Sequence, residues 1–214
     1  MPDSPRLVYW DIETSLQPVA VFQLANNDWI DPSNILAERY VICASWLLEG
    51  ETRVHSVSVL DDPKRYAKNP HDDFHVIKKL HEVLSNVDCL IHHNGDSFDK
   101  RYVETRMLVH GFPALPPTTT IDTYKVAKSR LMLNSNKLAY IGELLKVGKK
   151  VDTTPGLWMR VLNGERQAVR EMVMYNRGDV TLLRDVFMKL RPYVSNHLNR
   201  ELFGKTGCPR CGSN

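Results

Sequence analysis

Long hydrophobic runs are missing from this sequence of 214 residues: none approaches the roughly 18 apolar residues that a membrane-spanning helix requires. The first six residues, Met1 to Arg6, also lack the basic-then-apolar order of a signal peptide. Neither sign of charge is in large excess, since there are 28 Lys and Arg and 25 Asp and Glu, a formal net charge of only +3. We therefore expect a cytoplasmic protein without a membrane partner, in which any nucleic-acid contact is made by a local basic groove.

Cysteine is scarce, which argues against a framework of disulfide bonds. Of the four cysteines, Cys43 and Cys89 lie in apolar runs and are expected to be buried thiols. Cys208 and Cys211 form a C-x-x-C pair that looks like the first knuckle of a zinc ribbon, which needs a second pair of ligands to bind Zn²⁺. We expect one domain over residues 1–200 and a tail over 201–214 that carries a truncated ribbon.

The pattern of apolar residues predicts an α/β domain. Three strands in succession, followed by alternation of strands and helices, are typical of a mixed sheet covered by helices. Asp72 and Asp73 offer an N-cap for the first helix, and Gly111 ends the second. The expected strands cover residues 7–13, 40–48, 53–60, 87–92 and 118–122, and the expected helices cover 72–85, 98–110, 138–146 and 180–190.

Two acids end the first predicted strand. Residues two apart in a strand point to the same face, so Asp11 and Glu13 present their carboxylates side by side. The apolar run from Leu7 to Trp10 precedes them, and charge at the end of a buried strand is costly unless it has a partner. Because hard cations such as Mg²⁺ and Mn²⁺ prefer oxygen ligands, this pair is a candidate metal site.

Two further acids follow later in the chain. Asp99 begins a predicted helix, where a carboxylate could simply interact with the helix dipole. Asp96 is an alternative candidate for the metal ligand in this segment. We favour Asp99 because Phe98 is expected to enter the core and turn its neighbour toward the cleft. Tyr175 and Asp179 are four apart, which on a helix brings both onto one face. Gly178 beside them permits close approach of another backbone or a ligand.

The three segments, in this order, resemble the exonuclease motifs of the DnaQ-like (DEDD) superfamily, which has an RNase H-like fold. The resemblance covers about residues 7 to 190 and includes the Asp-Thr pair at Asp122. Within that superfamily, the sequence is most similar to stand-alone, phage-type members and to the proofreading domains of family B DNA polymerases. The motifs are Asp-x-Glu at Asp11 and Glu13, Asn-x-x-x-Phe-Asp from Asn94 to Asp99, and Tyr-x-x-x-Asp from Tyr175 to Asp179, the last of which marks the tyrosine (DEDDy) branch.

The resemblance implies a five-stranded sheet of order 3-2-1-4-5 and a metal-dependent 3′→5′ exonuclease that uses two Mg²⁺ or Mn²⁺ ions. Asp11 would bridge the ions, Glu13 and Asp179 would serve the ion that carries the attacking water, and Asp99 would serve the other. A phenol with a pKa of about 10 is a poor general base, so Tyr175 is expected to orient the water. The alternatives are an RNase H-like endonuclease and a catalytically silent nucleic-acid-binding module.

The expected substrate is single-stranded DNA or a frayed 3′ end, with RNA left open, and replication or recombination proteins are expected partners. If the chain is phage-encoded, its place would be the host cytoplasm. Trp158, on a loop, could stack on a base, although packing in the core is the simpler interpretation. Residues that could contact the substrate are Asn94, Lys149, Trp158 and Arg177, with Lys125, Lys128 and Arg130 as further candidates for phosphates and His92 and His93 for metal or substrate.

Overall fold

A computed structural model describes residues 5–21, 30–154, 156–198 and 208. Its five strands form one sheet, and one or more helices follow each of the last three strands in the chain. The strands are β1 (Leu7–Thr14), β2 (Val41–Leu48), β3 (His55–Ser58), β4 (Cys89–His92) and β5 (Thr119–Asp122). The helices are α1 (Pro63–Lys68), α2 (Phe74–Leu84), α3 (Asp99–Val109), α4 (Thr123–Arg130), α5 (Leu138–Leu144), α6 (Leu157–Leu162) and α7 (Arg166–Leu190), with short 3-10 turns at Pro32–Asn34, Val59–Asp61 and Arg191–Tyr193.

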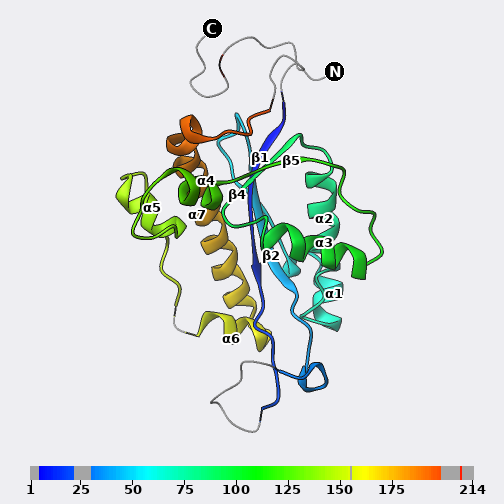
Figure 1. The fold of residues 1–214 in the computed structure, drawn as a ribbon. Coiled ribbons are helices and arrows are strands. Elements are labelled where there is room, and N and C mark those ends of the chain that lie inside the picture. Colours follow the sequence, from blue (N-terminus) through cyan, green and yellow to red (C-terminus); the bar gives the residue numbers. More distant parts are fainter. Residues whose placement is uncertain (1–4, 22–29, 155, 199–207, 209–214) are drawn as a thin grey trace.

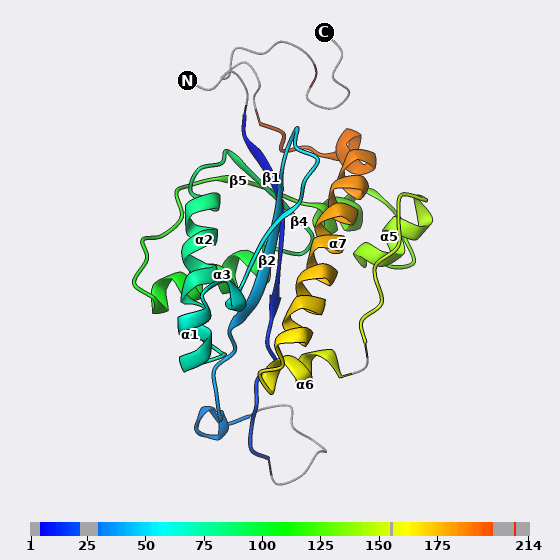
Figure 2. The same cartoon turned by 180° about the vertical axis from the view of Figure 1, so that it is seen from behind.

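The strand order is β3-β2-β1-β4-β5, which confirms the expected mixed sheet of order 3-2-1-4-5. β1 pairs antiparallel with β2, and β2 with β3, whereas β1, β4 and β5 run parallel. Figures 1 and 2 show this sheet nearly edge-on, with α1, α2 and α3 on one side and α4 to α7 on the other. Side chains alternate between the two layers, so Trp10 packs toward one apolar core and Tyr9 toward the other.

The last helix, α7, is longer than the sequence pattern predicted. It begins at Arg166 rather than near Val180 and crosses β1 and β2. The apolar stripe of its first half is interrupted because Asn176 and Asp179, both buried, face the core where apolar residues are normally found. The helices α1, α4 and α6 were not predicted either, and each has eight residues or fewer.

Asp73 links three elements of the fold through its side chain instead of capping α2. It occupies the N-cap position of α2, but its side chain makes no capping hydrogen bond; Asp72 accepts from the Phe74 amide instead. The carboxylate of Asp73 is fully buried and accepts from the Val41 amide at 2.9 Å and from two Arg106 nitrogens at 2.8 and 2.7 Å. His110 Nε2 lies 2.6 Å from it. Asp73 therefore joins α2, α3 and β2.

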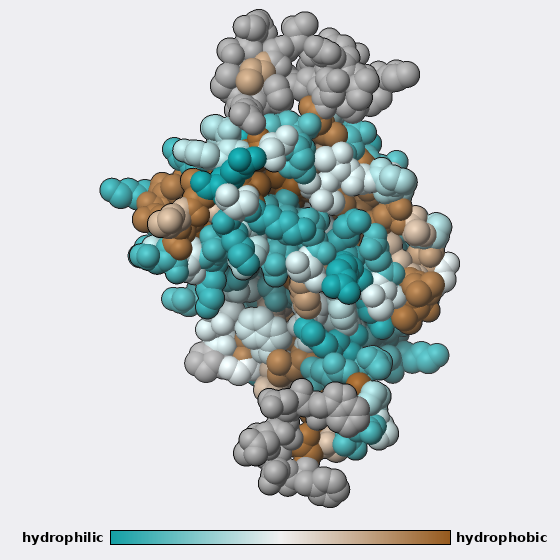
Figure 3. All heavy atoms as spheres, viewed as in Figure 1, coloured by the Kyte–Doolittle hydropathy of each residue, from teal (hydrophilic) through white to brown (hydrophobic). Residues whose placement is uncertain are grey.

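The surface in the view of Figure 3 is mostly hydrophilic, with smaller hydrophobic patches, one of them over α5. Exposed Leu144 and Met132 belong to that part of the chain. Among the described residues no helix is both long enough and apolar enough to span a membrane. In the tail, Cys208 is a partly buried free thiol and Cys211 lies outside the described residues, so the zinc ribbon stays a prediction.

Candidate metal centre

Three carboxylates converge where β1 meets α7. Asp11 and Glu13 point to the same side of β1, as expected from strand geometry, and Asp179 reaches them from the middle of α7. One oxygen from each of the three lies within 4.8 Å of the other two. Residues separated by more than 160 positions in the sequence thus form one cluster of oxygen ligands.

Asp99 lies beside this cluster but outside the group of three. It is the first residue of α3, it is 5% exposed, and its Oδ1 accepts a hydrogen bond from the Ile12 amide at 3.4 Å. Because Ile12 stands between Asp11 and Glu13, this bond holds the fourth carboxylate against the same strand. All four predicted acids are therefore neighbours.

Phe98 does not enter the core, so the physical reason given for favouring Asp99 was wrong. Its side chain is 36% exposed and stacks on Tyr102, with ring centroids 5.9 Å apart. The guanidinium of Arg39 lies over both rings, at 5.5 and 5.6 Å, and donates to Thr14 Oγ1 at 2.6 Å. This cation–π arrangement holds Phe98 at the surface, and Asp99 is the residue that faces inward.

Burial raises the pKa values of all four acids, and the neighbouring carboxylates raise those of Asp11 and Glu13 further. Burial raises the pKa of Asp11 well above its ordinary value, and Asp99 and Glu13 add to the rise. Burial followed by the charge of Asp179 raises the pKa of Glu13 to about 8, and burial raises that of Asp99 to about 6. Burial also raises the pKa of Asp179, although Lys150 opposes it. Negative charge in the cluster therefore exceeds the one cation beside it, Lys150.

The residues present fit divalent metal ions. All four donors are carboxylates, the set that hard cations such as Mg²⁺ and Mn²⁺ prefer. Asp179 Oδ1 is buried and accepts no hydrogen bond from any described residue, which is costly for a buried polar atom. A cation between these oxygens would satisfy that atom and remove the repulsion that raises the pKa values.

Lys150 is a residue of the centre that the sequence did not single out. Its Nζ lies 2.8 Å from Asp179 Oδ2 and 4.6 Å from the ring centre of Tyr175. Asp179 raises the pKa of Lys150 although burial alone would lower it. Gly178 allows the chain at Lys150 and Val151 to approach α7 closely. A Cβ at position 178 would lie 3.3 Å from Val151 Cγ2. The close approach predicted from Gly178 is therefore made by a side chain of this segment.

Tyr175 and Asn176 contact the acids, and Trp158 packs against Tyr175. Asn176 Nδ2 donates to Asp11 Oδ2 at 2.7 Å, and burial raises the pKa of Tyr175. Trp158 lies on α6 rather than on a loop; it is partly buried and meets Tyr175 edge to face, with ring centroids 6.1 Å apart. Its position supports Tyr175 and follows the simpler interpretation, packing against the core.

The other residues predicted to contact the substrate do not contact the four acids. Lys149 is exposed, whereas its neighbour Lys150 contacts the acids. Arg177 lies between Tyr175 and Asp179 in sequence but lines a different cavity, at the β3 edge of the sheet. Asn94 is exposed and has φ of 64°, a left-handed conformation that asparagine tolerates, so its turn role alone explains its presence.

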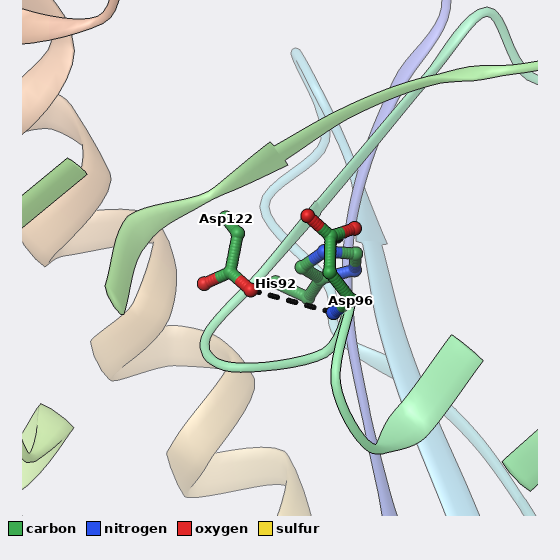
Figure 4. Close-up of side chains that lie close together, drawn as sticks. All are labelled: His92, Asp96 and Asp122. Atoms are coloured by element: carbon green, nitrogen blue, oxygen red, sulfur yellow. Dashed lines mark hydrogen bonds and ion pairs between the residues drawn. The ribbon is translucent and has the colours of Figure 1, made fainter. Parts of the chain in front are cut away.

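A second group of possible ligands, His92, Asp96 and Asp122, has a structural explanation. Asp122 accepts from the amides of Asn94, Tyr124 and Asp96, and Figure 4 shows it facing the Asp96 amide. Asp96 lies 3.0 Å from His92 Nε2 and 2.7 Å from Lys125 Nζ. These bonds hold the β4–α3 turn in place. Lys125 is thus paired with a carboxylate.

The other histidine, His93, is tied into the same region. Its Nδ1 lies 2.9 Å from Thr123 Oγ1, and its Nε2 lies 2.9 Å from the carbonyl oxygen of Asn136. Both ring nitrogens of His93 therefore have partners within the protein.

We predict that the metal-free Glu13→Gln variant becomes more stable than the metal-free wild type as the pH rises. The folded-state pKa of about 8 exceeds the ordinary 4.5, so the unfolded chain loses its proton first and folding stability falls between about pH 5 and pH 8. Gln removes this loss. Relative to wild type, the variant should gain about 2 kcal/mol in free energy of unfolding between these pH values, a figure reduced because neighbouring acids share the shift. Urea unfolding in EDTA at both pH values measures it; an equal difference at the two would contradict it.

Comparisons with known proteins agree with this fold. A search of the curated proteins found no match. Among solved structures, the family B DNA polymerase from the archaeon Pyrobaculum calidifontis matches with a TM-score of 0.60 and 15% identity, over 88% of this chain and 25% of that one. The chain thus spans about a quarter of that polymerase's length, and the likeness concerns the fold alone. The RNase H superfamily model matches residues 47–191, more than half of the chain. The chain belongs to the RNase H superfamily.

Proposed function

We propose that the chain is a metal-dependent 3′→5′ exonuclease of the DEDDy type, which hydrolyses phosphodiester bonds at the 3′ end of DNA. The convergence of Asp11, Glu13 and Asp179 within 4.8 Å, with Asp99 beside them, is the observation that carries this proposal. Membership of the RNase H superfamily supports a nuclease, and the Tyr175–Asp179 spacing on α7 supports the tyrosine branch.

The four acids would hold two divalent ions, Mg²⁺ or Mn²⁺, which when bound supply Lewis-acid stabilisation of the phosphate and a water of lowered pKa. The side chains of the protein do the rest. Asn176 keeps Asp11 in place by its hydrogen bond to Oδ2. Burial raises the pKa of Tyr175, so even less of the phenolate that could act as a base is present at neutral pH, and its hydroxyl would orient the attacking water rather than deprotonate it.

The exposed ring of Phe98, which stacks on the partly buried ring of Tyr102, offers a place for the terminal base. Both rings lie at the start of α3, next to Asp99, and a base can stack on an exposed aromatic ring without regard to its identity. This pair is a better candidate for stacking than Trp158, whose ring packs against Tyr175. A single-stranded or frayed 3′ end suits such a site because its bases are free to stack.

Lys150→Met should tighten divalent metal binding. In the metal-free protein the Lys150 ammonium neutralises Asp179 at 2.8 Å, so an arriving cation must compete with it. Because the Lys150 side chain is 36% exposed, its ion pair contributes about 1 kcal/mol, which corresponds to a roughly fivefold lower Kd for Mn²⁺ in the variant. Isothermal titration calorimetry of wild type and variant measures it.

Lys149→Met is the matched control, because Lys149 is adjacent and exposed. It removes the same charge from the chain but no contact with the acids. An equal effect of both substitutions on the Kd would mean that only the general charge matters, which would contradict the role given to Lys150.

A digestion of end-labelled DNA tests the function. With Mn²⁺ or Mg²⁺, linear single-stranded DNA should be shortened from its 3′ end with release of mononucleotides, whereas a closed single-stranded circle should stay intact. Cleavage of the circle would favour an RNase H-like endonuclease. Binding of the linear strand without metal-dependent release would favour a catalytically silent module. RNA of the same sequence, digested in parallel, compares the two substrates.

A further inference from the structure

A cavity of about 330 Å³ opens at the β3 edge of the sheet. We call it the β3-edge cavity. It takes residues from the strand and from helices that cover opposite faces of the sheet, α2 and α7 (Figure 2). Its polar and charged lining includes Arg53, His55, Asp61, His75, Lys79 and Arg177.

The charge of this cavity is positive and largely unpaired. Arg53, Lys79 and Arg177 are permanent cations, against the single acid Asp61. That acid is engaged in a capping box, in which its Oδ2 accepts from the Ser58 amide at 2.7 Å. Neither Arg53 nor Arg177 forms an ion pair with a described residue, and Lys79 has only the exposed Glu82, at 3.2 Å.

Two histidines also line the cavity. His55 stacks on Trp46, with ring centroids 5.8 Å apart, and its Nε2 lies 2.9 Å from the exposed Glu51. His75 enters the cavity from α2, on the same side as Lys79. A cavity with this lining, and with carboxylates that are already engaged, fits a polyanion.

The cavity lies near the acids but on another side of α7. Asp11 pairs with Ser45 of β2, and Ser45 pairs with Ser56 of β3, which lines the cavity. Two strand spacings separate Asp11 from Ser56, about 10 Å. Arg177 and Tyr175 are two residues apart on α7 and so face different directions. A strand that joins the two places must pass around the helix, which requires several nucleotides at about 3.4 Å each.

We propose that the β3-edge cavity binds phosphates of the nucleic-acid strand several nucleotides from the end that lies at the acids. This inference rests on the proposed function, because it assigns a second contact to the same substrate. It explains why a chain with a net charge of only +3 concentrates unpaired cations at one edge of the sheet. Long strands should therefore bind more tightly than short ones.

The test is the binding of fluorescein-labelled oligothymidylates of about 4 and about 16 nucleotides, followed by anisotropy in EDTA at several salt concentrations. Arg53→Glu with Lys79→Glu should weaken binding of the long strand by about tenfold or more and leave the short strand unchanged. The salt slope for the long strand should become shallower by about 1.4, because two phosphate contacts are lost. Both residues are exposed, and a thermal melt verifies that the variant is folded.

Lys146→Glu with Lys189→Glu is the matched control, since both residues are exposed and the net charge changes equally. Equal losses in the two double variants, or wild-type affinity for the long strand in the first, would overturn the proposal. The assay needs no catalysis, so it stands apart from the exonuclease proposal. Loss of long-strand binding without any nuclease activity would support the cavity alone, and exonuclease activity with no such loss would refute the cavity alone.

Discussion

Replacement of Asp11 by alanine is expected to lower the rate of 3′-end hydrolysis by at least about three orders of magnitude. Its carboxylate shares the cluster with Glu13 and Asp179, and Asp99 is the neighbouring charge that acts on it most strongly. Without it, neither of two neighbouring cations would keep its ligand set. The loss corresponds to about 4 kcal/mol of transition-state stabilisation, within what metal-ion catalysis contributes. The measurement is mononucleotide release from end-labelled single-stranded DNA with saturating Mn²⁺.

Glu104→Ala serves as the control for this experiment. Glu104 is an acid on α3, the helix of Asp99, but it pairs at the surface with Lys100 at 3.5 Å. Its replacement should leave the rate within about twofold of wild type, because an exposed ion pair contributes little. Equal rates for Asp11→Ala and wild type would contradict the proposed site.

Asp73→Ala is expected to destabilise the fold by about 3–5 kcal/mol. The substitution removes a fully buried carboxylate and leaves the Arg106 guanidinium, whose side chain is only 14% exposed, without its two hydrogen bonds. Loss of one member of a buried pair costs this much because the other charge stays desolvated. The Val41 amide also loses its acceptor. Urea unfolding followed by circular dichroism measures the free energy of unfolding.

The same Glu104→Ala variant is the control for stability, since its ion pair with Lys100 is partly exposed and should contribute less than about 1 kcal/mol. If Asp73→Ala unfolds at the same urea concentration as Glu104→Ala, the buried network does not hold α2, α3 and β2 together as described.

Much of the fold was predictable because strands leave a local signal. β1 is an apolar run that ends in acids, and β4 is an apolar run that ends at a turn, so both were located within about two residues. The sheet order came from the family resemblance rather than from such patterns, and the observed pairing confirms it. The four acids were found through short motifs, each weak alone, that occur in a specific order.

The missed features depend on tertiary contacts. The first half of α7 has polar Asn176 and Asp179 on its buried face, which hides the helical period. Sequence alone does not show which of the adjacent residues Lys149 and Lys150 contacts Asp179. The close packing of Val151 against Gly178 places Lys150 there. Phe98 looked like a core residue because nothing in the sequence indicates that Arg39 would cover it.

Diffraction from crystals soaked in Mn²⁺, with data collected for anomalous scattering, locates any metal ions bound by the four acids. Two anomalous peaks about 3.5–4 Å apart are expected among the carboxylates of Asp11, Glu13, Asp99 and Asp179. Peaks at His92, Asp96 and Asp122 instead, or no peak beside β1 at saturating Mn²⁺, would contradict the proposed metal centre.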